Sequence, residues 1–409
     1  MESYYIIIAT SIILILSHFY NRFSAKTNIP SVLLLIITGV VLQPLLSLRS
    51  VNQDSLFPIL EILGIIGLIM IVLEASLDLK LTRDRWPIIW KSGLTAILSL
   101  GLSILALTII FRLFYPGIPI LSAVLYAIPL SIMSSAVVIP SVVSLPEHRK
   151  EFMIYESTIS DILGIMVFYF VLEHGGANEA FSVIAIDITK NIFLTVVLSL
   201  VLGYILILAF QRITSDTKLF LLLATLLLLY STGKLFHLSS LLVILVFGLM
   251  LENRQLFFGG RLKNLIREEQ LHGLVGEFKS LTRETAFLIR TFFFVVFGLT
   301  IELITLANGK VILIALVFLI ITYGIRWALI ALFVGKDNSP LVFIAPRGLI
   351  SILLFFAIPE EHSFGGFEPG VLLFAILATT IIMSVAMVKY RHTKERNQKK
   401  AVLEMIEKE

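Results

Sequence analysis

The chain has 409 residues, of which 58% are hydrophobic and only 15% are charged, with a formal net charge of +4. Soluble domains carry about 25% charged residues, so this composition excludes an ordinary soluble globular protein. There is no cysteine, which excludes disulfides, thiol catalysis and cysteine-ligated metal sites. The seven histidines form no metal-binding motif, so we expect no cofactor. The basic excess indicates the cytoplasmic side of a membrane and no nucleic-acid partner.

Apolar runs long enough to cross a lipid bilayer recur along the whole chain, and each predicts a spanning helix. The first run lacks a basic flank and a small-residue cleavage site, so we interpret it as a span and not as a signal peptide. We expect thirteen spans, near residues 4–20, 30–48, 57–78, 87–114, 117–144, 152–172, 181–210, 217–233, 236–251, 285–304, 310–334, 338–359 and 367–388. The predicted fold is an all-α, polytopic membrane protein.

The distribution of Lys and Arg predicts the orientation, because these residues gather in cytoplasmic loops. With the N-terminus outside, the cytoplasmic side receives most basic residues, from Arg22 and Lys26 to Lys336 and the tail at 389–408. The outer loops receive only Arg49, Arg112, Lys190, Lys234 and Lys310. We therefore expect an outer N-terminus and a cytoplasmic C-terminus in a plasma or inner membrane.

Two spans carry matching interruptions. The fifth contains Pro129 and Pro140, and the twelfth contains Pro346 followed by Arg347 and Gly348. Proline removes a helix donor and clashes with the preceding turn, so both spans are predicted to be broken. With the seventh span as a linker, spans 1–6 and 8–13 form inverted six-helix repeats, and the breaks fall on the fifth member of each. Such breaks are predicted to cross near the midplane and to mark the substrate site.

Segment 252–284 is the sizeable polar stretch between the spans. Its apolar residues recur at roughly helical spacing among charges, which predicts an amphipathic helix on the membrane surface, either a linker or a regulatory element. Nearby, Glu74 and Asp78 are expected to form ion pairs at the cytoplasmic end of the third span, beside the basic residues at 80–85.

The sixth span holds acidic and hydroxyl residues that suggest a site for binding a cation or a proton. Ser157 and Asp161 share one helix face, and Glu156 and Ser160 share the adjoining face. A carboxyl at mid-span is costly unless it has a partner or binds an ion. Burial disfavours its ionised form and a nearby cation favours it, so the group binds a proton or a cation in competition. The candidate binding set, with Na⁺ held through Asp161 and Ser157, is Asp161, Ser157, Ser160, Ser134 and Ser135.

Two arginines lie inside predicted spans. Arg326 lies well within the eleventh span, and Glu156 is its leading partner, although a cytoplasmic position reached by snorkelling is the alternative. Arg347 lies at the twelfth-span break, where three roles remain open: contact with freed carbonyls, contact with Asp161, or exposure in a cytoplasmic vestibule. A structural role for Asp161 is the alternative to a carrier role.

These residues resemble the monovalent cation–proton antiporter superfamily, especially the sodium/proton exchangers of the archaeal NhaP type. That branch carries Glu-x-x-x-Asn-Asp on its sixth span, where this chain has Glu156 to Asp161 with Ser160 replacing Asn. Arg326 occupies the place of an arginine that pairs with the glutamate. The segments at 345–349 and 292–298 are also similar to the family's patterns. Where many relatives carry Thr-Asp-Pro, Ser134-Ser135-Ala136 stands, so a second carboxylate is missing.

The resemblance implies a homodimer in the lipid bilayer that exchanges a monovalent cation, Na⁺ or Li⁺, for H⁺. It implies dimerisation helices in 1–82 and 213–306, core helices in 83–175 and 307–390, a linker helix in 176–212 and a short tail in 391–409. With one titrating carboxylate in the core, we expect electroneutral exchange by alternating access.

Other functions remain open from the sequence. A K⁺/H⁺ antiporter of the same fold is the nearest alternative, followed by a cation channel and a sensor that transports nothing. An intramembrane enzyme would need a nucleophile–base pair or a metal cluster, and neither is apparent, so we expect no enzyme.

Overall fold

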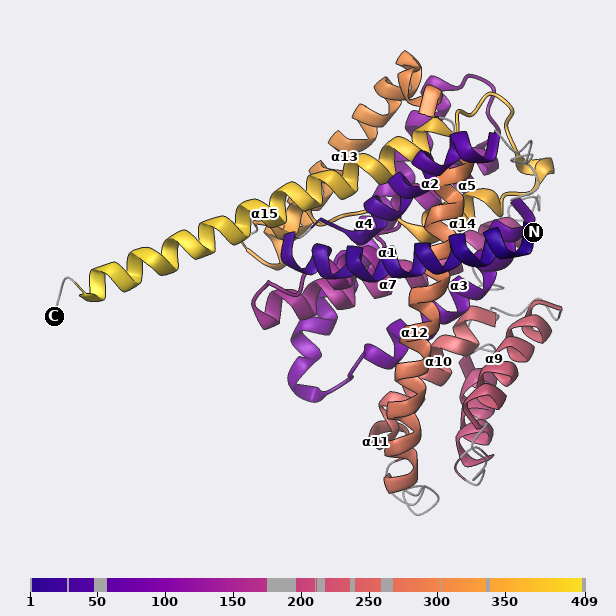
Figure 1. Cartoon of the computed structure of the whole chain (residues 1–409), viewed down its shortest axis with the longest axis vertical. Coiled ribbons are helices and arrows are strands. Elements are labelled where there is room, and N and C mark those ends of the chain that lie inside the picture. The colour runs from indigo at the N-terminus through magenta and orange to yellow at the C-terminus, as the bar shows by residue number, and fades with distance from the viewer. Residues whose placement is uncertain are drawn as a thin grey trace. The chain divides into compact units, whose positions relative to one another are not determined.

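The computed structural model describes residues 2–27, 29–47, 57–174, 196–209, 211, 218–235, 240–258, 268–301, 303–335 and 339–406. Regular structure in these ranges is entirely helical (Figure 1). The longer helices are α1 (Glu2–Thr27), α2 (Ser31–Ser47), α3 (Phe57–Asp78), α4 (Trp86–Phe114), α7 (Glu147–His174), α9 (Lys218–Leu235), α10 (Ser240–Glu252), α12 (Glu268–Thr300), α13 (Gly309–Phe333) and α15 (Gly370–Ile406). The short α-helices are α5 (Ile120–Ser131), α6 (Ser135–Ser141), α11 (Arg254–Phe257) and α14 (Leu349–Phe356).

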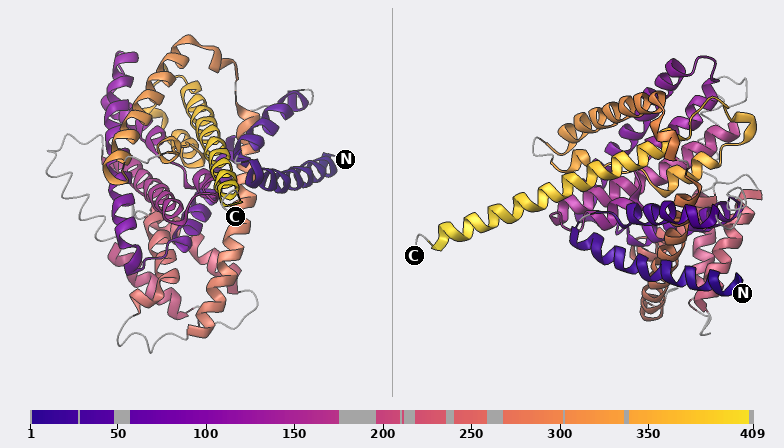
Figure 2. Two further views of the ribbon diagram at one scale, coloured as in Figure 1. Left: turned by 90° about the vertical axis from the view of Figure 1, so that its left-hand side faces the viewer. Right: turned by 45° about the horizontal axis from the view of Figure 1, so that its top comes forward.

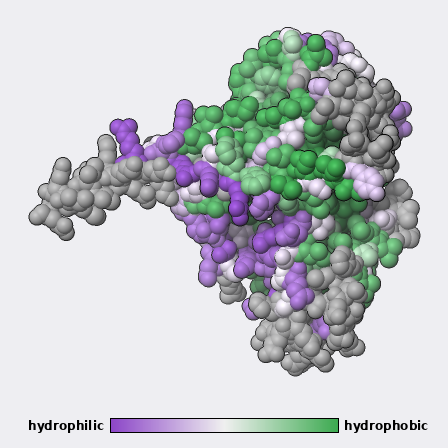
Figure 3. Space-filling view, in the orientation of Figure 1, coloured by the Kyte–Doolittle hydropathy of each residue, from purple (hydrophilic) through white to green (hydrophobic). Residues whose placement is uncertain are grey.

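Six helical stretches in the described ranges are long and apolar enough to cross a membrane: Ile7–Ser24, Trp86–Phe114, Ile120–Ser141, Glu147–Leu172, Gly309–Phe333 and Gly370–Thr393. Shorter apolar helices occupy Ser31–Pro44, Val196–Ala209 and Leu241–Glu252. Figure 3 shows large apolar areas on the surface drawn there, as lipid-facing helices require. The count of thirteen spans stays a prediction, and most of the seventh span lies outside the described residues.

The chain divides into two compact units. Unit 1 comprises Met1–Leu60, Pro87–Gly164 and Thr291–Glu409, and unit 2 comprises Glu61–Trp86 and Ile165–Arg290. The resemblance groups the first two helices with residues 213–306, whereas the contacts of this structure group them with residues 87–164. The division into dimerisation and core helices therefore stays a prediction.

Within unit 1, α1 and α2 pack against the second half of α12. Ser17 on α1 shares a hydrogen bond of 2.7 Å with Thr291. A Cβ added to Gly39 on α2 would lie only 2.8 Å from the Cα of Gly298, so both glycines are needed for this close approach of two backbones. Gln43 then donates to the carbonyls of Gly298 and Ile301 at the end of α12, at 3.0 and 2.6 Å. These contacts explain why the first two helices group with this unit.

Also within unit 1, α13 and α15 lie side by side (Figures 1 and 2). The last helix is longer than the predicted span at 367–388, since α15 remains helical through most of the charged tail. Good helix formers such as Lys, Glu, Arg and Ala dominate that tail, which explains the continuation.

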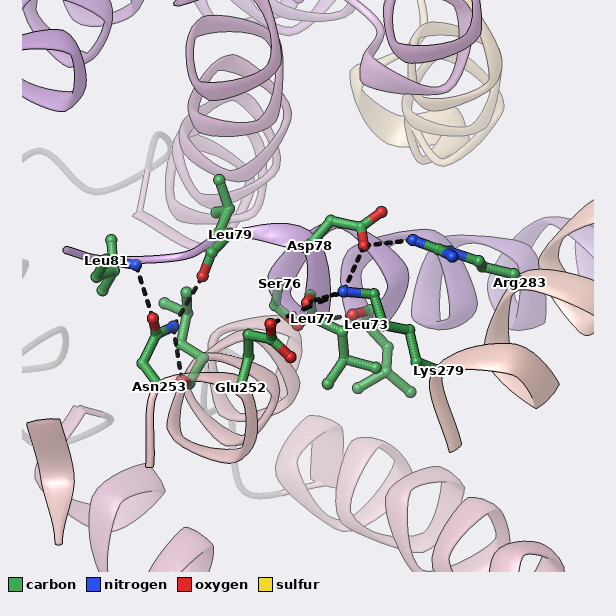
Figure 4. A network of polar contacts seen from close by, with 11 residues as sticks. Leu73, Ser76, Leu77, Asp78, Leu79, Leu81, Glu252, Asn253, Lys279 and Arg283 are labelled. Carbon is green, nitrogen blue, oxygen red and sulfur yellow. Dashed lines mark hydrogen bonds and ion pairs between the residues drawn. The ribbon is translucent and has the colours of Figure 1, made fainter. Parts of the chain in front are cut away.

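Within unit 2, a polar network ties the end of α3 to α12 (Figure 4). Asp78 accepts from Lys279 and from Arg283, each at 2.8 Å. Lys279 also donates to the carbonyl of Leu77 at 2.8 Å, which satisfies a free carbonyl at the C-terminal end of α3. Glu74 pairs with Arg290 at 3.1 Å. The expected ion pairs of Glu74 and Asp78 thus form with partners on α12.

Asn253, directly after α10, fixes the chain that leaves α3. Its side chain donates to the carbonyl of Leu79 at 2.8 Å and accepts from the N–H of Leu81 at 2.6 Å (Figure 4). One buried amide therefore satisfies two backbone groups of an extended segment, as buried polar groups require.

The polar stretch 252–284 differs from the expected separate surface helix. Residues 259–267 lie outside the described residues, but α12 runs without interruption from Glu268 to Thr300. The second half of the stretch is therefore the first half of the helix that contains the predicted tenth span. No proline lies between Glu268 and Thr300, so nothing breaks the helix where the polar part meets the apolar part.

Candidate functional site

Both predicted interruptions are present in the backbone of unit 1. α5 ends at Ser131, residues 132–134 are not helical, and α6 begins at Ser135. In the other span, a short 3₁₀ helix, η5 (Leu341–Phe343), is followed by non-helical residues 344–348 and then by α14. Pro346 cannot donate a backbone hydrogen bond, which helps to keep its segment out of a helix. Pro129 and Pro140 instead lie inside α5 and α6, close to the first break.

The two interrupted segments touch each other. The backbone N–H of Ser134 donates to the carbonyl of Pro346 at 2.9 Å. An added Cβ on Gly348 would lie 2.5 Å from the Oγ of Ser134, so only glycine permits this approach. We call the contact of residues 132–134 with residues 344–348 the crossing.

Arg347 binds carbonyls from both sides of the crossing. Its Nε donates to the carbonyl of Leu130, near the C-terminal end of α5, and its Nη1 donates to the carbonyl of Ala345 at 3.1 Å. The side chain is 2% exposed, and its guanidinium lies 5.5 Å from the centre of the Phe318 ring. Of the three roles left open by the sequence, the structure shows contact with carbonyls that the breaks leave without helix partners.

Asp161 lies against the first break and is 3% exposed. Its Oδ2 accepts from the backbone N–H of Ser135 at 2.9 Å, the first residue of α6. Beside it, Ser160 accepts from the N–H of Met133 at 3.0 Å. Two adjacent residues of α7 thus satisfy backbone donors that the break leaves free. The other carboxyl oxygen of Asp161, Oδ1, is buried and has no hydrogen-bond partner.

Several buried hydroxyls of the same unit also have no hydrogen-bond partner. They include Ser134 at the crossing, Thr158 on α7 and Ser351 on α14. Ser157 donates to the carbonyl of Ile154 at 3.2 Å, so its oxygen still has free lone pairs. Sequence reasoning did not select Thr158 and Ser351. Two sequence features could have identified them. Thr158 lies three residues before Asp161 on the same helix, and Ser351 lies three residues after the second break.

The structure brings Glu156 and Arg326 together. The guanidinium of Arg326 donates to both carboxylate oxygens of Glu156, at 2.6 and 3.0 Å, and the side chains are 3% and 1% exposed for Arg326 and Glu156. Arg326 also donates through Nε to the carbonyl of Leu341 in η5 at 3.1 Å. The pair therefore links α7, α13 and the segment that leads to the second break, and Arg326 does not lie at a solvated surface.

Together, these residues make two chemically different acidic positions on α7. Each carboxylate oxygen of Glu156 accepts a hydrogen bond from Arg326, whereas Asp161 keeps one oxygen free beside the crossing. Carboxylate, hydroxyl and carbonyl oxygens are the ligands that hard cations prefer. The arrangement is suited to binding a small cation or a proton at Asp161 and to holding the helices in place through Glu156.

Comparisons with known proteins agree with this geometry. The family model for the sodium/hydrogen exchanger, transmembrane, matches residues 7–389. The structure is similar to that of the sodium proton antiporter MjNhaP1 from Methanocaldococcus jannaschii at pH 8, with a TM-score of 0.72 at 19% sequence identity, over 96% of this chain and 98% of that chain. An electron-microscopy structure of MjNhaP1 gives a TM-score of 0.70 at 19% identity, over 96% and 97%. No curated protein sequence matches. This chain belongs to the sodium/hydrogen exchanger family and is an integral, multi-pass membrane protein.

Proposed function

We propose that this chain is a secondary active antiporter that exchanges Na⁺ or Li⁺ for H⁺, one for one, with both ions competing for Asp161. Family membership supports cation/proton antiport as the activity. The observation that carries the finer proposal is the free Oδ1 of buried Asp161, next to two crossed breaks and unpartnered hydroxyls.

The binding chemistry follows from that geometry. An ionised carboxyl inside a membrane needs a compensating charge, and either a proton or a monovalent cation supplies it. Ser134, Ser157, Thr158 and Ser351 offer neutral oxygens, so one bound Na⁺ would make a neutral site with Asp161. Arg326 and Glu156 compensate each other and take no part in the exchange.

The exchange ratio follows from the number of titrating carboxyl groups at the binding site. At the position where many relatives carry an acid, Ser135 donates its backbone N–H to Asp161. With one titrating carboxyl, each cycle carries one cation one way and one proton the other way. We expect an imposed membrane potential to drive no net exchange when ion gradients are zero. Exchange that reverses with the potential would contradict one-for-one coupling.

The remaining features of the proposal follow the family resemblance. We expect a homodimer in a plasma or inner membrane, with an outer N-terminus and alternating access around the crossing.

The first test is cation-induced pH change inside proteoliposomes, with Na⁺, Li⁺ and K⁺ added separately. We expect Na⁺ or Li⁺ to give a signal in the wild type and Asp161→Asn to abolish it. Asp84→Asn is the matched control, because Asp84 is exposed in η2 (Arg83–Arg85), and it should exchange normally.

Each other outcome would change the proposal. A response to K⁺ alone would make the chain a K⁺/H⁺ antiporter. Cation flux without proton counter-movement would indicate a channel. If folded wild-type protein gives no signal with any of these ions over a broad pH range, the antiporter proposal fails.

A further inference from the structure

Aromatic side chains gather at the end of unit 1 where α4 ends and α5 begins. Phe367, in the loop between α14 and α15, stacks on Tyr126 of α5, with ring centroids 4.1 Å apart and planes inclined by 8°. Its ring also contacts those of Phe111, Tyr115 and Phe355, at 5.1, 5.3 and 6.0 Å. We call these five residues the aromatic cluster.

Four of the five aromatic side chains are buried, and Phe355 is half-buried. Phe111, Tyr115, Tyr126 and Phe367 are 0, 2, 5 and 7% exposed. This is unusual for Phe367, because it belongs to a connecting loop whose neighbours Gly366 and Pro369 are exposed. The loop therefore points one large ring inward, among rings from α4, α5 and α14.

Hydrogen bonds hold the loop in that position. The hydroxyl of Tyr126 accepts from the backbone N–H of Phe364 at 3.2 Å and lies 3.4 Å from the Oγ of Ser363. The N–H of Phe367 donates to the carbonyl of Phe364 at 2.8 Å. Tyr126 thus fixes the loop backbone through its hydroxyl and the Phe367 ring through its own ring face.

The cluster lies over the half-helices that lead to the crossing. Tyr126 is six residues before Ile132, and Phe355 is seven residues after Gly348, which corresponds to roughly 10 Å of helix in each case. α5 and α14 pack against each other. The ring of Phe367 therefore contacts both half-helices at the end of the unit that lies beyond the crossing.

We propose that Phe367, held by Tyr126, seals this end of the crossing against water and ions. The proposal rests on the proposed antiport function. An antiporter holds a gradient only if its site is never open to both sides, and broken helices expose backbone groups that attract water. A dry aromatic constriction excludes ions because they would enter it without their hydration shell. The charge distribution predicts that this end faces the outside.

Loss of the seal should cause a proton leak, whereas a loss of stability alone should not. In proteoliposomes with a pH gradient and no transportable cation, wild-type protein should hold the gradient. Phe367→Ala should dissipate it several-fold faster, because water and protons reach the crossing. Phe293→Ala is the matched control: its ring is also fully buried, in a ring cluster on α12, and its loss should lower stability without a leak.

The absence of native cysteine permits a direct test of access that does not depend on activity. Ser131 at the end of α5 is 4% exposed, and Ala307 lies at the same end of the unit as the loop, since its neighbour Asn308 contacts Glu368 at 3.4 Å. A membrane-impermeant thiol reagent, added on the side where Ala307→Cys reacts, should label Ser131→Cys only slowly, during the part of the transport cycle that opens this end. Labelling should be several-fold faster when Ser131→Cys is combined with Phe367→Ala. It should stay slow with Phe367→Leu, which keeps an apolar side chain in the seal.

The two proposals fail in different ways. If the wild type shows no cation-dependent exchange, the proposed function fails whatever Phe367 does. If the wild type exchanges ions, but Phe367→Ala neither leaks nor exposes position 131, the seal is overturned and the aromatic cluster is packing alone. If the alanine variant does not fold, Tyr126→Leu decides, because it removes the hydroxyl and the ring face that hold Phe367 in place. Labelling of position 131 no faster than in the wild type would then overturn the seal.

Discussion

At the residue scale, the two acids of α7 have different surroundings, and the proposed function gives them different roles for that reason. Glu156 meets a guanidinium that satisfies both of its oxygens, whereas Asp161 meets one backbone N–H and keeps a free oxygen. Removing one member of a buried pair leaves an uncompensated charge, which costs more than the pair contributes.

Replacing one member of the ion pair should therefore destabilise the protein more than replacing both members. We expect Arg326→Gln to cost about 3–5 kcal/mol, because the carboxylate of Glu156 would be left unpaired. The double variant Glu156→Gln/Arg326→Gln should recover part of that loss. Thermal unfolding in detergent measures both. Equal losses in the single and double variants would show that the pair is not coupled.

The unpartnered hydroxyls should affect cation binding more than stability. Ser134→Ala and Thr158→Val remove oxygens that make no hydrogen bond within the protein, so we expect a higher KM for the cation and a nearly unchanged melting temperature. Ser141→Ala is the control on α6, because its hydroxyl is already bonded to the carbonyl of Val137 at 2.7 Å. Exchange assays over a range of cation concentrations decide. An unchanged KM in both variants would remove these hydroxyls from the site.

At the element scale, the crossing depends on how closely two non-helical segments approach. One backbone hydrogen bond joins them, and Arg347 donates hydrogen bonds to the carbonyls of Leu130 and Ala345, one from each side. These three hydrogen bonds hold the ends of the half-helices together.

Gly348→Ala tests this close approach. The new methyl group would lie 2.5 Å from the Oγ of Ser134, and overpacking of this kind costs about 1–3 kcal/mol. Ser134→Gly in the same chain removes the clash and should restore part of the melting temperature. Gly324→Ala on α13 is the control, with no atom within 4 Å of the added Cβ, and should lose nothing. If Gly348→Ala is as stable as the wild type, the segments are less closely packed than described.

At the scale of the whole molecule, the asymmetry of Lys and Arg predicts an outer N-terminus and a cytoplasmic C-terminus. Single cysteines in this cysteine-free chain can test that orientation. Ala307 ends the short 3₁₀ helix Leu303–Ala307, and Thr393 lies on the charged part of α15. Both residues are exposed, and the charge distribution places them on opposite sides of the membrane. In intact cells, an impermeant thiol reagent should label position 307 and not position 393. The reverse pattern would invert the predicted topology.

Composition and motif spacing by themselves determined the class of protein. Long apolar runs require helices in a membrane, because every backbone group in lipid needs an internal partner. The same cost applies to charges, so Glu156, Asp161 and Arg326 could be selected from the sequence as residues that need partners or ions. The family resemblance is confirmed by the match over residues 7–389.

Only the tertiary structure decided which groups actually meet. Three contacts join residues far apart in the chain: Arg347 with the carbonyl of Leu130, Asp78 with Lys279 on α12, and the ring of Phe367 with that of Tyr126. Helical spacing predicts which residues share a face of one helix, but it does not say which face another helix covers. Whether the side-chain oxygens of Asp161, Thr158 and Ser351 find a hydrogen-bond partner depends on that packing. The sequence shows that these oxygens exist, but only the packed structure shows which of them have no partner.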